Sequence, residues 1–183
     1  MIKAMKKVLA CTLAAAVAFG GASVASAATK SPTDSVKPVT KSDVKTSVGT
    51  VDVKKDGTAA IDAIKATSKK TVTVASTVTV NGVKYKVTKI DANAFKNCKK
   101  VTKVTLPATV TTISKNAFAG AKKLTTVTLK VTKAITVKKG AFKGLNTKKI
   151  TIKVSKKMNA KQLKKFKTIL KKAGFKGKVV KTA

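Results

Sequence analysis

The feature that most constrains the fold is a short repeat in the middle of the chain. An Ala-Phe pair recurs at residues 94–95, 117–118 and 141–142, so that successive copies are 23 and 24 residues apart. Apolar residues also recur at fixed distances after each pair. A unit this short has too little apolar surface to fold alone, whereas stacked units bury one continuous core. The spacing therefore predicts a repeat, or solenoid, fold that is mostly β with short helical turns, in residues 87–154.

The aligned copies predict two buried columns of side chains. One consists of the three repeated phenylalanines, Phe95, Phe118 and Phe142. The other points inward from short parallel strands and consists of Val104/Leu106, Val127/Leu129 and Ile150/Ile152. Cys98 occupies the same repeat position as Ala121 and Leu145, so we expect a buried small side chain and not a reactive thiol.

Residues 48–86 precede the repeats and have the period-2 alternation of β-strands. One pair of alternating segments is separated by Asp56-Gly57. A second pair, Thr71–Val80 and Val83–Val87, is separated by Asn81-Gly82, which is a preferred dipeptide of two-residue hairpin turns. We expect β-hairpins here that cap the N-terminal end of the repeats.

Residues 155–183 have the pattern of an amphipathic helix. Asn159 is a candidate N-cap and Gly174 lies where a C-cap is expected. Apolar residues recur at helical spacing between them, at Leu163, Phe166, Ile169, Leu170 and Ala173. Lysines cover the other faces, so the helix could bind a membrane surface. We favour a cap that covers the last repeat, because terminal units of a solenoid must be closed.

The N-terminus predicts export. Lysines near Met1 are followed by the apolar run Val8–Val17 and by the small residues Ala25-Ser26-Ala27, which is the pattern of a cleavable signal peptide over residues 1–27. The apolar run is shorter than the roughly 20 residues that a spanning helix needs. Residues 28–47 are polar and contain prolines, which predicts a disordered linker. We therefore expect a secreted protein, retained at the cell surface.

The composition removes most kinds of catalysis. All 41 basic residues are lysine, the six acidic residues are all aspartate, and histidine is absent, for a formal net charge of +35. Without histidine there is no imidazole base, no Ser-His-Asp relay and no histidine metal ligand. Scattered aspartates make a carboxylate pair for acid–base work improbable. We expect no enzyme activity, no metal site and no cofactor.

The run VTKVTLPATVTTISKNAF, residues 101–118, resembles the repeat of the BspA-like, or treponemal-type, leucine-rich-repeat proteins of bacteria. The hairpin before it resembles the segment that often leads into such repeats. Departures are Ala121 and Leu145 in place of a cysteine and Lys130 in place of a proline. The resemblance implies a short leucine-rich-repeat array in a secreted or surface-exposed protein that binds other molecules, in a family associated with adhesion and not with catalysis.

If Val104 and Leu106 point inward, the residues beside them point outward and line a face formed by the strands. The candidate ligand-binding residues on that face are Lys103, Thr105, Thr126, Thr128, Lys149 and Thr151. Among these, Thr105, Thr128 and Thr151 are 23 residues apart, which predicts one column of hydroxyl groups. A simpler interpretation is that threonine favours strands and lysine favours water.

Taken together, the sequence predicts an exported, non-catalytic leucine-rich-repeat binding module that adheres to anionic polymers. The expected partners are anionic cell-wall polymers, host matrix proteins or glycans. One alternative is a secreted cationic protein that binds polyanions, of nucleic-acid or antimicrobial type. The other is a hydrolase that works without the usual catalytic bases. Base-specific recognition is not expected, because arginine is absent and few aromatic residues are free to stack on bases.

Overall fold

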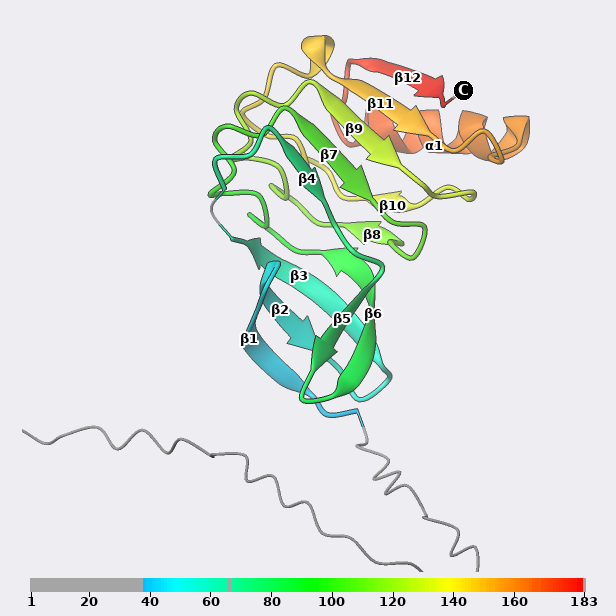
Figure 1. The fold of residues 1–183 in the computed structure, drawn as a ribbon. Helices are drawn as coiled ribbons and strands as arrows, with labels where there is room; N and C mark the ends of the chain where they lie inside the picture. Colours follow the sequence, from blue (N-terminus) through cyan, green and yellow to red (C-terminus); the bar gives the residue numbers. More distant parts are fainter. Residues whose placement is uncertain (1–37, 66, 183) are drawn as a thin grey trace, which may run out of the picture. The chain divides into compact units, whose positions relative to one another are not determined.

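The computed structural model describes residues 38–65 and 67–182 of the 183-residue chain. The predicted signal peptide, residues 1–27, and residues 28–37 of the predicted linker lie outside the described residues. The elements in chain order (Figure 1) are β1 (Lys41–Thr46), β2 (Gly49–Val53), β3 (Thr58–Ile64), β4 (Thr71–Thr73), β5 (Thr77–Val80), β6 (Val83–Ile90), β7 (Lys103–Leu106), β8 (Thr112–Ile113), β9 (Thr126–Leu129), β10 (Thr136–Val137), the 3-10 helix η1 (Thr147–Lys149), β11 (Thr151–Val154), α1 (Ala160–Lys172) and β12 (Lys178–Lys181). The described part is thus mostly β with one α-helix, as predicted.

The strands form two sheets, and the chain alternates between them. The first has the order β1-β2-β3-β6-β8-β10, with β5 also paired to β6. The second has the order β12-β11-β9-β7-β4, and all of its neighbouring strands are parallel. From β6 onward the chain passes to β7, back to β8, to β9, back to β10 and to β11, which Figure 1 shows as successive coils. This coil is the predicted solenoid.

Turn chemistry defines the hairpins of the first sheet. At the turn between β2 and β3, the Thr58 hydroxyl and amide both donate to Asp56 Oδ1, at 2.6 and 2.9 Å, and these hydrogen bonds lower the pKa of Asp56. Between β5 and β6, Asn81 and Gly82 both have positive φ, at 50° and 79°. This is the conformation that a type I′ turn requires. The predicted hairpin at Asn81-Gly82 is confirmed.

The prediction of one continuous strand over Thr71–Val80 is wrong. Its first part, β4, pairs in parallel with β7 in the second sheet, and its last part, β5, pairs antiparallel with β6 in the first. The chain crosses between the sheets at residues 74–76, where Val74 N still donates to Thr105 O at 2.9 Å. Alternation marks both parts as extended, but it carries no information on which partner each part has.

The predicted linker is also shorter than expected, because residues 41–46 form β1. This strand pairs antiparallel with β2, and the turn between them is closed by the Thr46 hydroxyl, which donates to Gly49 O at 2.8 Å. A bulge near Asp43, which has a φ of 53°, turns Val44 toward the core. The polar composition hid this strand because only one of its faces packs against the protein.

The predicted phenylalanine column is confirmed. The ring centroids of Phe95 and Phe118 are 4.8 Å apart and those of Phe118 and Phe142 are 5.0 Å apart, and the rings stack. Asn93, Asn116 and Gly140, which precede the three Ala-Phe pairs, have φ values of 61°, 59° and 75°. Glycine and asparagine adopt this left-handed conformation most readily. The same local turn therefore brings each phenylalanine into the core.

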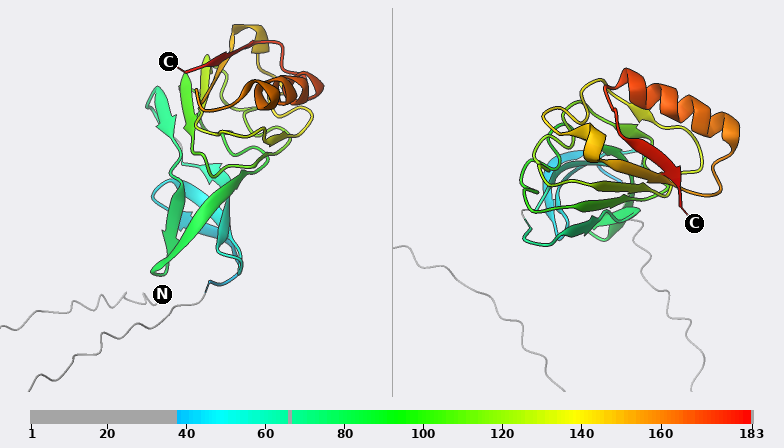
Figure 2. Two further views of the ribbon diagram at one scale, coloured as in Figure 1. Left: turned by 90° about the vertical axis from the view of Figure 1, so that its right-hand side faces the viewer. Right: turned by 90° about the horizontal axis from the view of Figure 1, so that it is seen from above.

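The C-terminal segment closes the array, as predicted. Asn159 Oδ1 accepts a hydrogen bond from Gln162 N at 2.8 Å, and Gly174 has a φ of 86° just after the helix. The buried side of α1 packs against the core, and Phe175 adds a fourth ring 5.2 Å from Phe142. Figure 2 shows α1 at the C-terminal end of the stacked strands. The chain then adds β12 to the second sheet, a strand that the helical pattern did not predict.

Candidate binding surface

The outward side of the second sheet, which we call the strand face, is a grid of threonines and lysines. Between the outward residues, Val72, Val104, Val127 and Ile152 point toward the core. The register places the outward residues in two rows, in sheet order Thr71, Lys103, Thr126, Thr151 and Lys178, and Thr73, Thr105, Thr128, Lys153 and Val180. The strand face thus combines hydroxyl groups with three ammonium groups.

The structure brings together five of the six predicted site residues. Lys103, Thr126 and Thr151 are neighbours in one row, and Thr105 and Thr128 are neighbours in the other. The predicted stack of Thr105, Thr128 and Thr151 is wrong in its last member, because Lys153 is the residue that pairs with Thr128. Lys149 lies in η1, exposed and outside the strand face.

The third repeat is out of the predicted register because its turn is longer. Val101 follows Phe95 by six residues, whereas the buried Ile150 follows Phe142 by eight. The 3-10 helix η1 takes up the difference. Consequently Ile152 and Val154, and not the predicted Ile150 and Ile152, pair with the inward residues of β9. An alignment by chemical type alone does not detect this shift, since valine and isoleucine alternate with polar residues in both registers.

Charge is distributed unevenly along the chain. Asp91 is the last acidic side chain in the sequence, whereas lysines recur from there to the C-terminus. In the described residues, the ion pair is Lys89 with Asp91, with Nζ 2.6 Å from Oδ1. The N-terminal strands therefore carry mixed charge, and the later repeats, α1 and β12 carry positive charge alone. A surface whose charged groups are all positive attracts polyanions over distances of about a Debye length.

Two titratable groups in the described residues have raised pKa values. Burial raises the pKa of the Cys98 thiol to about 11, so the thiol is protonated at neutral pH. Burial, and then repulsion from Asp52, raises the pKa of Asp62. No group of three potential metal-ligating side chains is present within residues 38–65 and 67–182.

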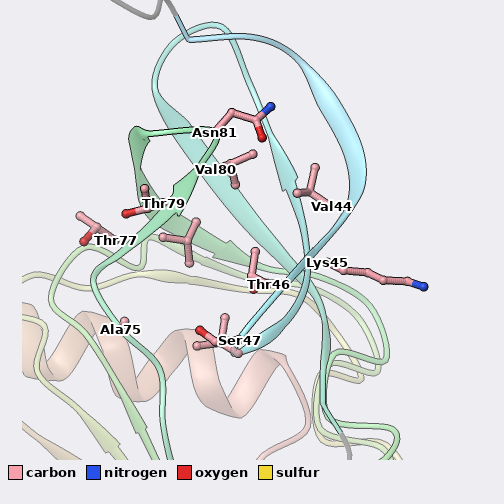
Figure 3. A pocket seen from close by; sticks show the side chains of 11 residues that line it. Val44, Lys45, Thr46, Ser47, Ala75, Thr77, Thr79, Val80 and Asn81 are labelled. Atoms are coloured by element: carbon pink, nitrogen blue, oxygen red, sulfur yellow. The ribbon is translucent and has the colours of Figure 1, made fainter. Parts of the chain in front are cut away.

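A hollow of about 410 Å³ lies between β1 and β5, and Figure 3 shows its lining. The lining side chains are mainly methyl and hydroxyl groups, such as those of Val44, Thr77 and Val80, with Lys45 and Asn81. These groups include no nucleophile activated by a base. The hollow therefore offers shape and hydrogen-bonding groups.

The sequence of this chain matches a known family model. Residues 83–179, more than half of the chain, match the model described as "BspA type Leucine rich repeat region (6 copies)". The chain belongs to the BspA-type leucine-rich-repeat family. Members of this family are typically non-catalytic and are usually extracellular or cell-surface proteins. Curated proteins include no significant match to this chain.

Two solved structures resemble this BspA-type protein. One is a leucine-rich cell surface protein from Faecalibacterium prausnitzii A2-165, with 27% identity and a TM-score of 0.45, covering 66% of this chain and 34% of the other. The second is a leucine-rich repeat protein from Bacteroides ovatus ATCC 8483, with 24% identity and a TM-score of 0.41, covering 56% and 34%. This chain thus spans about a third of each of those proteins.

In the residues that the structure describes, no helix is both long enough and apolar enough to cross a bilayer.

Proposed function

We propose that this BspA-type protein is an exported binding module that adheres to anionic polymers at a cell surface. The observation that carries the proposal is the one-signed charge of the repeats and their C-terminal cap, which have no acidic side chain after Asp91. Such a surface binds polyanions through many weak contacts, and each contact releases a counterion. The proposed binding is therefore multivalent and sensitive to salt.

The placement of the aromatic residues supports adhesion to a polymer backbone over base recognition. Every aromatic side chain in the described residues is buried, namely Tyr85, Phe95, Phe118, Phe142, Phe166 and Phe175. Single-stranded nucleic acids are held by stacking of bases on exposed aromatic rings. The described surface offers only charge and hydrogen bonds, so the proposed partner is recognised by its charged backbone.

The buried side of α1 argues against the membrane-active alternative. Phe166 and Leu170 are buried, and Leu163 and Ile169 pack against the same core. An interfacial helix needs its apolar face free to enter the lipid. In this protein that face is already used to close the array, which supports the adhesion proposal.

Selectivity, in this proposal, comes from the strand face. Lys103, Lys153 and Lys178 lie among threonine hydroxyls on five adjacent strands. A ligand with regularly spaced anionic groups and hydrogen-bond acceptors fits such a grid. Thr105 and Thr128 are half-buried and lie on strands that are paired on both sides, so little backbone entropy is lost when they bind.

The test is retention of the purified protein on cell-wall polymer, matrix glycan and DNA across a salt series. We expect retention near 0.15 M salt that decreases with salt at different rates for different partners. Loss of retention on every partner at the same salt concentration would show that the strand face gives no selectivity and that charge alone holds the protein to its partners. No retention on any partner near 0.15 M salt would reject the proposed function. The matched variants are Lys103→Gln with Lys153→Gln, compared with Lys164→Gln and Lys171→Gln on the exposed side of α1.

A further inference from the structure

Three turns that lead into the second sheet each carry two lysines at their tips. In each turn the first carbonyl accepts a hydrogen bond from the amide three residues later: Val101 N to Cys98 O at 3.1 Å, Leu124 N to Ala121 O at 3.0 Å, and Ile150 N to Thr147 O at 3.0 Å. The two central residues are lysines in every case. These six exposed residues, which we call the lysine ridge, are Lys99, Lys100, Lys122, Lys123, Lys148 and Lys149.

The three turns stack because the strands that follow them are paired. β7, β9 and β11 are neighbours in parallel register, and the ladder already begins at the turns. Thr125 N donates to Thr102 O at 2.9 Å, and Thr151 N donates to Thr125 O at 2.8 Å. Neighbouring strands lie about 4.7–4.9 Å apart. The first two lysine pairs lie three and two residues before Thr102 and Thr125, so they follow one another at about that spacing along the edge of the strand face. The third pair lies one residue closer to its own strand.

The positive charge of the lysine ridge is not compensated by carboxylates. The chain has no acidic side chain after Asp91, and the described ion pair lies at Lys89, outside the ridge. The Lys122 ammonium donates to Gly144 O of the next repeat at 3.3 Å, which directs it along the stacking axis. Six like charges at this spacing repel one another, and an anion that runs along the ridge relieves the repulsion.

A hollow at the N-terminal end of the ridge adds hydrogen-bond donors. It has a volume of about 300 Å³ and is lined by Thr67, Ser68, Asn97, Lys99 and Lys100. Two hydroxyls, one amide and two ammonium groups are donors suited to phosphate oxygens. This shallow hollow thus places further hydrogen-bond donors beside the first pair of the ridge.

We infer that the lysine ridge is the docking track for a linear phosphate polymer that lies across the three turns. The inference rests on the proposed function, and it names the polymer class and the part of the surface that holds it. Lysine binds phosphate as a point charge and needs no planar fork. Phosphate groups lie in the polymer backbone itself, so docking them fixes fewer rotatable bonds than docking carboxylates that are carried on flexible side chains.

The experiment compares two variants that lose the same charge. The ridge variant carries Lys→Gln at Lys99, Lys100, Lys122, Lys123, Lys148 and Lys149. The control variant carries Lys→Gln at six exposed lysines of α1, which are Lys161, Lys164, Lys165, Lys167, Lys171 and Lys172. Binding of inorganic polyphosphate is measured by fluorescence anisotropy across a salt series, and far-UV circular dichroism checks that both variants are folded.

We expect the ridge variant to bind polyphosphate at least tenfold more weakly near 0.15 M salt, and the control variant to lose less than threefold. If all six ridge lysines contact phosphate, the plot of the logarithm of the binding constant against the logarithm of the salt concentration becomes shallower in the ridge variant. The magnitude of its slope should decrease by about 4, as for single-stranded polyanions. Polyglutamate of equal total charge should bind the wild-type protein more weakly than polyphosphate.

Three outcomes would overturn the inference, and they are distinguishable from failure of the proposed function. Equal loss in the two variants would show that bulk charge and not the ridge holds the polymer. Ridge-dependent binding of polyglutamate as tight as that of polyphosphate would reject phosphate as the recognised group. Competition by millimolar orthophosphate would point to a single-anion site instead of a track. If the wild-type protein binds no polyanion near 0.15 M salt, both the inference and the proposed function are rejected.

Discussion

Replacing Phe118 with alanine tests the packing of the solenoid most severely. The ring is fully buried in the middle of the column, 4.8 Å from Phe95 and 5.0 Å from Phe142 between ring centroids. Removing a buried phenylalanine costs about 3–5 kcal/mol through lost transfer free energy and the cavity that remains. The two stacked contacts account for about 1–3 kcal/mol of this. Because whole domains are stable by only about 5–15 kcal/mol, the variant loses a large share of its stability.

The assay is equilibrium unfolding in urea, followed by far-UV circular dichroism. With a slope of about 1–3 kcal/mol per molar urea, the midpoint for Phe118→Ala should fall by at least about 1 M. Phe118→Leu keeps most of the volume and should cost about 1–2 kcal/mol. Phe175→Ala, at the end of the column with a single tilted neighbour, should cost less than Phe118→Ala. A cost for Phe118→Ala below about 1 kcal/mol, or no greater than for Phe175→Ala, would refute a continuous aromatic core.

Three other substitutions or treatments test separate contacts. Gly120→Ala should destabilise the fold by about 1–3 kcal/mol in the same urea assay, because the added Cβ would meet the Lys96 backbone of the preceding repeat. The buried Cys98 thiol should resist a thiol-reactive dye at pH 8 until urea unfolds the protein. Folding raises the pKa of this thiol from 9.0 to about 11, so the free energy of unfolding should decrease as the pH rises from 9 to 11. This part of the decrease should be absent in Cys98→Ala. Asn159→Ala removes the cap of α1 and should cost about 1 kcal/mol, with Asn159→Asp retaining most of the stability.

Local chemistry made part of this fold predictable from the sequence. The Asn-Gly turn, the cap at Asn159 and the glycine after α1 each depend on a few adjacent residues, and the structure confirms all three. The phenylalanine column was predictable for a different reason. Each Ala-Phe pair follows a residue suited to positive φ, so the same turn is built three times and the rings must stack.

Features that depend on distant pairing were not predictable in the same way. Residues 71–80 alternate throughout, yet β4 and β5 pair with strands of different sheets. The register of β11 depends on η1, a short 3-10 helix whose residues resemble an ordinary lysine-rich turn. This shift replaced Thr151 with Lys153 in the predicted threonine stack and left Lys149 off the strand face.

The lysine ridge was visible in the sequence as three Lys-Lys pairs at similar positions after the repeated phenylalanines. Of the six ridge lysines, Lys149 alone is a predicted binding residue, and it is assigned to the strand face, because the chain has so many lysines that any one pair carries little information. The hydrogen bonds that close the three turns give the pairs a common position, and this position is the signal that composition lacks.

The most direct test of binding by the charged repeats is an NMR titration of the isotope-labelled protein with polyphosphate near 0.15 M salt. Our account predicts that the backbone amides of the three turns, residues 98–101, 121–124 and 147–150, shift first and saturate together. The amides of β1, β2 and β3, where the aspartates concentrate, should stay unchanged at the same concentration. Shifts that are equally large on α1 and on the three turns would contradict a defined track, and the absence of any shift would contradict the binding function itself.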